Sequence, residues 1–477
     1  MKFDTLVDLP RARSVADELV TKWELDRALR PYRSHYWTPS QEELPVLHLE
    51  DLTGIPFLDG VAGILEYQHR ARVRAGDGDL FAAGTAPAEG YEAYCRNLLE
   101  LGSPDFIFAS GDDPMEVCLA CLQPEAFQRL KRRADEAGGL VIHPYMSIEA
   151  TWQLAQALAE KGAGQVAVLG PPTPVLWVAN DKAHFSTLVE RVLGPEWIVE
   201  TRRSRDPLVL AEALRDLAQS CDQVGLKRTR CASAMGNAVF DGGELRRLSA
   251  GECRAIIDEF LTRTRWCDGE DVLVVEWRDT DLSPSTQLWI PPEEDGPPQL
   301  DGVYEQLLEG PEKVFLGSYP STLPEAVNQA LLDASLQVAA ALQRMGYVGR
   351  CSFDFIVTGD PDGEFHAQFT ECNGRWGGTS TPMHLIDRIV PYEDERPTYV
   401  ATDYFLPESH RGMTFRDIQT ALGEQLYTPE NGGGRFILYN VGPLTEHGKF
   451  DVISLGDDPE DAQHGLDEVL PGLLGIL

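Results

Sequence analysis

The first third of the chain alternates short apolar runs with segments of helical periodicity. A short apolar run bounded by polar or turn residues predicts a strand, whereas apolar residues spaced three and four apart predict a helix. On this basis we expect strands at 105–109, 140–143 and 165–169, and helices at 124–137 and 148–161. Because strands that alternate with helices form parallel sheets, residues 1–170 predict an open parallel sheet. The stretch 170–174, GPPTP, has the composition of a linker.

Residues 171–385 mix both element types without regular alternation. The expected strands are 176–179, 224–228, 237–240, 272–277 and 287–290, and the expected helices are 181–193, 207–220, 249–264 and 324–345. After about residue 385 the composition of the sequence changes again. A Pro- and acid-rich run, PYEDERP, precedes expected strands at 398–405 and 435–440. We interpret 386–477 as a small C-terminal domain.

The segment from Gly349 to Thr381 carries the most distinctive pattern. Residues 353–357 and 364–370 are rich in β-branched and aromatic residues, and the sequence DPDG between them is typical of a turn. This combination predicts a β-hairpin. A solvated acidic hairpin is one interpretation, but the interleaved phenylalanines indicate buried strands, in which carboxylates without partners are costly.

Three oxygen-bearing side chains converge near the end of this hairpin. Side chains alternate between the faces of a strand, so Glu371 and Asn373 point the same way, and regular antiparallel pairing brings Asp354 close to them. Carboxylate and carboxamide oxygens suit Mg²⁺ rather than zinc. Arg375 and the pair Gly377-Gly378 follow, a guanidinium and a flexible backbone able to meet phosphate oxygens. The sequence therefore predicts a Mg²⁺–nucleotide site.

Asp354 followed by Glu371-Cys372-Asn373 resembles the metal-binding signature of the ATP-grasp superfamily. The longer run ECNGRWGGTSTPM is similar to that of the pheganomycin-type peptide ligases, whose chains carry an additional domain before the ATP-grasp core. The resemblance covers most of the chain after about Pro171 and is weaker before it. It implies an ADP-forming carboxylate–amine ligase that uses ATP and Mg²⁺, passes through an acyl phosphate, and joins an amino acid to a peptide in natural-product (antibiotic) biosynthesis.

The resemblance also implies a domain plan. The fold class is α/β and α+β, with an open parallel sheet as the pre-ATP-grasp domain at 1–170 and a two-lobed ATP-grasp core at 171–385. The lid of that core lies at roughly 223–270, and the small C-terminal domain follows at 386–477.

Two lysines match positions that bind ATP in the ATP-grasp pattern. Lys182 opens a helix, and Lys227 lies in a short strand before a loop of small residues. The chain has no G-x-x-x-x-G-K-[ST] motif, so this is not a P-loop protein. Most lysines lie on the surface, and each of these two is also compatible with that position. We expect Lys227 to act both in ATP binding and in catalysis.

The resemblance places further residues around the nucleotide. Ser233 and Gly236 belong to the loop over the phosphates, where the commoner family form has more glycines. Glu276 and Trp277 are expected beside adenine, although a strand-end glutamate can equally face solvent, and Asp281 is expected near the ribose. Arg375 is expected to stabilise the transferring phosphoryl group, while Asp354, Glu371 and Asn373 hold Mg²⁺.

Charge and composition limit the classes of binding partner that the protein is expected to have. Lys and Arg number 41 against 76 Asp and Glu, a net charge of −35, which argues against nucleic-acid or anionic-membrane partners. No segment approaches the roughly 18 apolar residues of a membrane helix, and the N-terminal sequence lacks the apolar core of a signal peptide. Nine scattered cysteines fit reduced thiols. We expect a cytoplasmic protein with a small-molecule carboxylate and an amine or peptide as substrates; the related ligases are often homodimers.

Two other functions remain open at this point. A non-catalytic ATP-binding regulatory homologue would keep the fold without the reaction, although such copies typically lose one of the site residues. A phosphotransferase would share the nucleotide half of the reaction. Hydroxylamine separates it from a ligase, because an acyl phosphate gives a hydroxamate and a phosphate ester does not.

Overall fold

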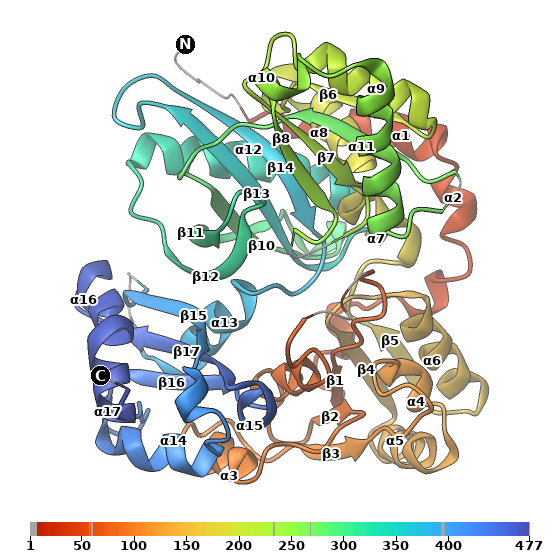
Figure 1. Ribbon diagram of the computed structural model, residues 1–477. Helices are drawn as coiled ribbons and strands as arrows, with labels where there is room; N and C mark the ends of the chain where they lie inside the picture. The colour runs from red at the N-terminus through yellow and green to blue at the C-terminus, as the bar shows by residue number, and fades with distance from the viewer. Residues whose placement is uncertain are drawn as a thin grey trace.

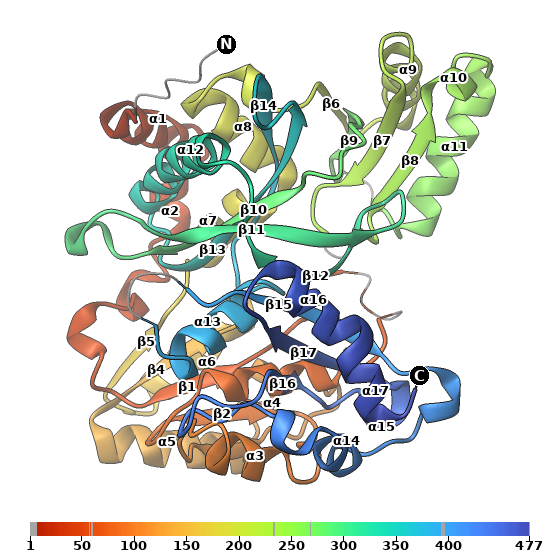
Figure 2. The same ribbon diagram turned by 90° about the vertical axis from the view of Figure 1, so that its left-hand side faces the viewer.

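The computed structural model describes residues 7–56, 58, 61–231, 234–267, 269–392 and 396–476. Within these residues the strands form sheets of five, four and eight strands. In Figure 1 the five-stranded sheet and the C-terminal strands lie side by side in the lower half, below the other strands. Figure 2 shows the four-stranded sheet projecting from the upper half of the molecule.

The five-stranded sheet confirms the parallel sheet expected in the first third of the chain. Its order is β3-β2-β1-β4-β5, and all four pairings are parallel. The strands are β1 (Val46–Leu49), β2 (Leu80–Ala83), β3 (Asp105–Phe108), β4 (Gly139–Pro144) and β5 (Gln165–Val168), and the helices include α3 (Tyr91–Asn97), α4 (Val117–Ala120), α5 (Pro124–Ala137) and α6 (Glu149–Glu160). The sequence analysis did not identify β1 and β2, which are only four residues long.

The four-stranded sheet is antiparallel. We call it the lid sheet because two of its strands fall within the lid predicted at roughly 223–270, and those bounds stay a prediction. Its order is β6-β9-β7-β8, made of β6 (Thr201–Ser204), β7 (Gln223–Arg228), β8 (Asn237–Asp241) and β9 (Val272–Glu276). Helices α9 (Pro207–Leu217) and α11 (Ala250–Arg263) pack together and share one apolar core with these strands. The predicted capping box at the start of α11 is present, because Ser249 accepts from the Glu252 N–H while the Glu252 carboxylate accepts from the Ser249 N–H.

The eight-stranded sheet connects the core to the C-terminal region. Its order is β14-β13-β10-β11-β12-β15-β17-β16. The strands are β10 (Pro284–Ile290), β11 (Gln299–Glu309), β12 (Val314–Pro320), β13 (Gly349–Gly359), β14 (Phe365–Asn373), β15 (Tyr399–Phe405), β16 (Phe436–Asn440) and β17 (Lys449–Leu455). The boundary at residue 385 stays a prediction, and the sheet continues across it from β12 to β15.

Helices cover one part of this sheet and bury its core. Helix α12 (Glu325–Arg344), α8 (Lys182–Val192) and α1 (Leu9–Lys22) contact one another and belong to one apolar cluster with β10, β13 and β14. The remaining helices include α2 (Leu25–Ala28), α10 (Gly242–Leu245), α13 (Ser380–Ile389), α14 (Phe415–Leu422), α15 (Leu444–His447), α16 (Pro459–His464) and α17 (Leu470–Leu474). Among the described residues no helix combines the length and apolarity that crossing a bilayer requires.

The strand expected at 176–179 is wrong. These residues belong to helix α7 (Thr173–Asn180), which follows Pro172 and has Pro174 in its first turn. Proline lacks an N–H and fixes its own φ, so it is well suited to the start of a helix. A short apolar run cannot by itself separate a strand from a buried helix. The stretch 170–174, interpreted as a linker, is in part the start of this helix.

The N-terminal and C-terminal regions share one apolar core. Tyr91 and Tyr94 of α3 are buried among residues of β15, β16 and β17. The Tyr91 hydroxyl donates to the carbonyl of Tyr439 at 2.7 Å, and the Leu438 N–H donates to the Tyr94 hydroxyl at 3.0 Å. Segments more than 340 residues apart in sequence are therefore packed against each other.

Candidate active site

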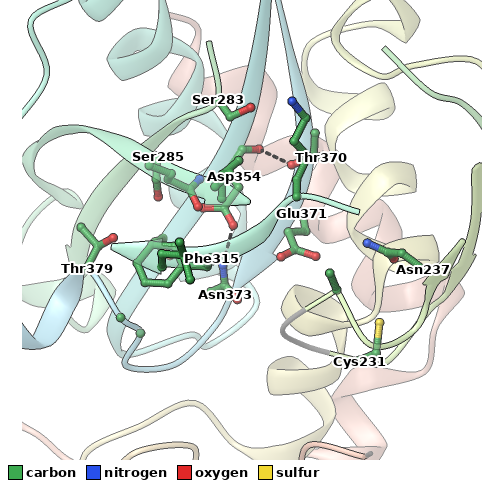
Figure 3. Close-up of a pocket in the computed structure, with 18 of the residues that line it drawn as sticks. Cys231, Asn237, Ser283, Ser285, Phe315, Asp354, Thr370, Glu371, Asn373 and Thr379 are labelled. Carbon is green, nitrogen blue, oxygen red and sulfur yellow. Dashed lines mark hydrogen bonds between the residues drawn. The ribbon is translucent and has the colours of Figure 1, made fainter. Parts of the chain in front are cut away.

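A cavity of about 290 Å³ opens between the lid sheet and the eight-stranded sheet. Its walls come from β7, β9, β10, β12, β13 and β14, from the segment around Leu52–Arg70, and from the C-terminal strands. Figure 3 shows Asp354, Glu371 and Asn373 on one side of it, with Cys231 and Asn237 of the lid on the other. The predicted residues Lys182, Lys227, Glu276, Trp277, Asp354, Glu371, Asn373 and Arg375 all line this cavity.

The β13–β14 hairpin brings the predicted metal ligands together. Asp354 pairs directly with Glu371 across the two strands, and the register shifts just after this pair. The irregularity places an extra residue, Thr370, in β14, and its hydroxyl donates to the Asp354 carbonyl at 3.1 Å. Bulges next to functional sites commonly redirect side chains. Asn373 Nδ2 donates to Asp354 Oδ2 at 2.8 Å, so the carboxamide and both carboxylates meet at one place (Figure 3).

Lys182 is held deep in the site by the start of α8. The Asp181 carboxylate caps the helix, and the Lys182 N–H donates to the Thr229 carbonyl of the lid at 2.9 Å. The side chain is 4% exposed. Its ammonium contacts Glu371 Oε2 at 2.9 Å and donates to the Cys231 carbonyl at 3.2 Å. Burial alone would lower the pKa of Lys182, but Cys231 and Glu371 outweigh burial and raise it, so the lysine is charged.

Lys227 projects from β7 toward the same carboxylates. Its ammonium lies 5.0 Å from the centre of the Trp277 ring, a cation–π geometry. Burial lowers the pKa of Lys227, and the charge of Glu371 offsets part of that effect. Two ammonium groups from different elements therefore face the carboxylates of the hairpin. Two such cations suit a ligand that carries several negative charges.

The pKa values of the two carboxylates shift in opposite directions. Burial, together with the charge of Glu371, raises the pKa of Asp354 to about 7. Burial also raises the pKa of Glu371, but Lys182 and Lys227 reverse this and bring it below its usual value. A divalent cation at this position would keep both groups ionised.

The donor set fits Mg²⁺. Two carboxylates and one carboxamide supply oxygen ligands, and Mg²⁺ usually retains several waters rather than a complete protein cage. The described part of the chain contains no group of three or more His, Cys, Asp or Glu arranged to hold a metal. A zinc-type site is therefore absent from the described residues, whereas the oxygen set of the hairpin matches a hard cation that shares its coordination with phosphates.

At the other end of the lid sheet, Glu276 is the last residue of β9 and Trp277 follows it. Glu276 forms an ion pair with Arg278 at 3.1 Å, and the Trp277 N–H donates to the Gln223 carbonyl at 3.1 Å. That N–H is already occupied, and the expected position of Glu276 and Trp277 beside adenine stays a prediction. The Trp277 ring packs on Gly225, where a Cβ would lie 2.6 Å from a ring carbon. A side chain at Gly225 would displace the ring.

Two residues that were predicted to bind the nucleotide do not line the cavity. The Asp281 side chain is fully exposed, and its carboxylate lies 4.0 Å from the Lys313 ammonium. Asp281 belongs to the segment before β10 and is not among the residues that line the cavity. Gly236 contributes structure instead: its carbonyl accepts from the Arg228 N–H, and a Cβ there would lie 2.5 Å from Cys231 Sγ. A third predicted residue, Ser233, lies outside the described residues.

Arg375 is positioned by the turn after β14. The Gly374 N–H donates to Asn180 Oδ1 at 3.1 Å, and Trp376 Nε1 donates to His143 Nε2 at 3.1 Å. Between these two anchors the Arg375 guanidinium lies 5.6 Å from the Tyr145 ring centre and faces the cavity. The turn is thus fixed to α7 on one side and to the parallel sheet on the other.

The sequence analysis missed the opposite wall of the cavity. Tyr67, Arg70, Tyr145, Asp403 and Asp451 line it. They come from the 3₁₀ segment Glu66–Val73, from the residue after β4, and from β15 and β17. No local motif marks them. Only the long-range packing between the N-terminal and C-terminal regions brings them together.

Comparisons with known proteins agree with this architecture. Residues 68–160 match the family model described as Pre ATP-grasp domain. No curated protein matches the sequence.

Solved structures match over almost the whole chain. An N5-carboxyaminoimidazole ribonucleotide synthetase in its ADP complex is 14% identical with a TM-score of 0.53, covering 91% of this chain and 97% of its own. The same enzyme from Thermus thermophilus is 14% identical with a TM-score of 0.51, covering 90% and 98%. The biotin carboxylase domain of Hydrogenobacter thermophilus 2-oxoglutarate carboxylase, solved with MgADP, ADP and bicarbonate, is 14% identical with a TM-score of 0.52, covering 91% and 93%. These likenesses show that the chain shares its overall fold with these enzymes, and the ATP-grasp core at 171–385 stays a prediction.

Proposed function

We propose that this protein is an ATP-dependent, ADP-forming carboxylate–amine ligase that works through an acyl phosphate. The observation that carries the proposal is the convergence of Lys182, Lys227, Asp354, Glu371 and Arg375 on one cavity between lid and core. The solved structures with the same fold include complexes with ADP and with MgADP. Their resemblance supports the placement of a nucleotide between the two sheets.

The arrangement assigns a task to each group. Lys182 and Lys227 neutralise the phosphates of bound ATP, and Asp354, Glu371 and Asn373 would hold Mg²⁺. When bound, Mg²⁺ supplies charge neutralisation to the β- and γ-phosphate oxygens. A substrate carboxylate attacks the γ-phosphorus, and the bond from that phosphorus to the β–γ bridging oxygen breaks, giving an acyl phosphate and ADP.

Arg375 then serves the second half of the reaction. Its guanidinium faces the cavity next to the hairpin and stabilises negative charge on the phosphoryl group or on the tetrahedral oxyanion. A neutral amine attacks the acyl carbon, phosphate leaves, and the amine loses a proton. The protein forms no covalent bond with the substrate in this scheme, so no nucleophilic triad is required.

The finer predictions rest on the resemblance of the run ECNGRWGGTSTPM to the pheganomycin-type ligases. They are peptide-bond formation between an amino acid and a peptide, a role in antibiotic biosynthesis, a cytoplasmic location and a homodimer. Fold alone does not determine substrate, and these points stay predictions.

The test is ADP release from Mg·ATP across a panel of amino acids and short peptides, added singly and in pairs, with mass spectrometry of the products. The ligase predicts ADP formation that depends on a carboxylate–amine pair, with a product lighter than the sum of the two by one water. ADP formation that yields a phosphorylated end product would favour the phosphotransferase. ATP binding without turnover for any pair would favour the non-catalytic homologue.

A further inference from the structure

Two carboxylates face each other at the end of the cavity that the C-terminal strands form. Asp403 of β15 and Asp451 of β17 are direct partners in the antiparallel register, and both line the cavity. Like charges directly opposite each other destabilise a sheet. The position therefore carries an energetic cost that needs a compensating charge.

The neighbouring cations compensate one carboxylate better than the other. The Lys449 ammonium forms an ion pair with Asp403 and a hydrogen bond with the Tyr67 hydroxyl. Arg70, which also lies nearby, donates through Nε to the Glu50 carboxylate at 3.0 Å and shares that carboxylate with Arg74. Among the described residues no ion pair within 4 Å reaches Asp451.

Asp451 retains an unused acceptor. Asn440 Nδ2 donates to its Oδ2 at 2.9 Å, whereas Oδ1 is buried and has no hydrogen-bond partner among the described residues. The residue is 4% exposed. A buried acceptor without a donor costs about 1–3 kcal/mol, more when it is charged.

We propose that Asp451, with Asp403 beside it, binds a cationic nitrogen group, an ammonium or a guanidinium, carried by one of the substrates. Such a group brings several N–H donors, which can bond the free oxygen, and a positive charge, which offsets the repulsion between the two carboxylates. The amine that attacks an acyl carbon must be uncharged. The group bound here is therefore a second nitrogen that takes no part in the reaction. This proposal rests on the proposed ligase function.

The surroundings of the pair suit this ligand. Tyr67 and Tyr439 line the same end of the cavity and provide aromatic walls. The hairpin carboxylates and lysines line the same cavity, so one substrate can place its cation at Asp451 while its reacting group lies near the phosphates. A metal ion is a poorer occupant, because no third His, Cys, Asp or Glu completes a metal cluster among the described residues.

The test compares cationic probes with neutral isosteres on the full chain loaded with Mg·ADP. The pairs are L-leucine with isocaproate, ε-aminocaproate with caproate, and γ-guanidinobutyrate with γ-ureidobutyrate, which place the cation at different distances from a carboxylate. Isothermal titration calorimetry measures each dissociation constant. We expect at least one cationic probe to bind roughly 10-fold or more tightly than its isostere, the size of one charge-assisted hydrogen bond.

Variants connect this preference to the carboxylate. Asp451→Asn keeps the shape and removes the charge, and it should abolish the preference. Asp362→Asn makes the same charge change at the exposed turn of the β13–β14 hairpin and should leave the preference intact, which controls for general attraction to an acidic protein. Asp403→Asn is the second variant and should weaken the preference if Asp451→Asn does not fold.

The outcomes separate this subsite from the ligase reaction. A preference that is absent in all three pairs, or that survives in both Asp451→Asn and Asp403→Asn, overturns the subsite even if the protein proves to be a ligase. A preference lost on Asp451→Asn supports the subsite even if no probe supports ADP formation. A hydroxamate formed from a cationic probe assigns the cation to the carboxylate substrate. ADP formation that needs a second carboxylate assigns it to the amine substrate.

Discussion

The two ends of the cavity treat buried carboxylates differently. At the hairpin end, Glu371 has a direct ammonium partner in Lys182, and Asp354 accepts from Asn373. At the C-terminal end, Asp403 has Lys449, but Asp451 keeps an oxygen without a partner among the described residues. We propose that the first end, whose carboxylates have partners within the chain, receives the nucleotide phosphates with Mg²⁺. We propose that the second end, where one carboxylate oxygen lacks a partner, receives a cationic ligand.

The largest expected effect is at the hairpin end. Glu371→Gln should lower ADP formation by at least about a thousandfold, because it removes a metal ligand and the partner of Lys182 together. The variant should fold but unfold at a lower temperature than the parent, since the Lys182 ammonium stays buried with a weaker partner. ADP release and thermal unfolding measure the two effects. Turnover at the parental rate would show that the metal assignment is wrong.

A smaller effect is expected for Lys227. Lys227→Met should raise KM for ATP by roughly 10- to 100-fold, because the lost ammonium contributes about 1.5–3 kcal/mol to a charged ligand. Substrate-saturation kinetics with ATP varied provide the measurement. Asp362→Asn, at the exposed hairpin turn, is the control and should keep the parental KM. An unchanged KM in Lys227→Met would place the phosphates elsewhere.

A substitution at the C-terminal end of the cavity should stabilise the protein, whereas Glu371→Gln should destabilise it. Asp451→Asn should stabilise the free protein by roughly 0.5–1 kcal/mol, because it removes the repulsion from Asp403. Burial, with the charge of Asp403, raises the pKa of Asp451 well above its usual value, and Lys449 and Arg70 only partly oppose this.

The same pair gives a pH dependence with a defined sign. Below pH ~4 Asp451 is protonated in both the folded and unfolded states. Between pH ~4 and its raised folded-state pKa, the folded protein binds more protons than the unfolded one, so the free energy of unfolding falls as pH rises. The difference in the free energy of unfolding between Asp451→Asn and the parent should therefore grow as pH rises through this range. Melting curves of both proteins across pH test it, and a pH-independent difference would contradict the account of the pair.

A modest effect on catalysis is expected at the turn that carries Arg375. Trp376→Phe removes the donor to His143 Nε2 while keeping most of the buried ring, which is 4% exposed. The loss of one neutral hydrogen bond, about 1 kcal/mol, should lower kcat several-fold with little change in KM for ATP. A larger change in KM than in kcat would mean that the turn positions the nucleotide rather than Arg375.

Local pattern was sufficient for much of the hairpin end. The β13–β14 hairpin and its turn follow from alternation along two paired strands. Asp354 meets Glu371 only because Thr370 is an extra residue in β14, since unbroken pairing would place Thr370 opposite Asp354. The parallel sheet followed from the alternation of strands and helices. Lys182 and Lys227 came from the family resemblance, and the structure brings both to the same cavity.

The remaining features depend on contacts that no local pattern encodes. Residues 176–179 form part of α7 because two prolines start a helix, which outweighs the strand-like apolar run. The Asp403–Asp451 pair requires β15 to pair with β17, and the pairing of β12 with β15 joins these strands to the sheet that carries the hairpin. Asp281 was placed by resemblance alone, and the turn before β10 directs it to solvent.

Hydroxylamine trapping tests the central claim most directly. The full chain is incubated with Mg·ATP, hydroxylamine and each carboxylate of the panel, beside Glu371→Gln, and products are analysed by mass spectrometry. The account predicts that at least one carboxylate gives its hydroxamate with an equal amount of ADP, and that Glu371→Gln gives neither. ADP formation accompanied by a stable phosphate ester and no hydroxamate would contradict it.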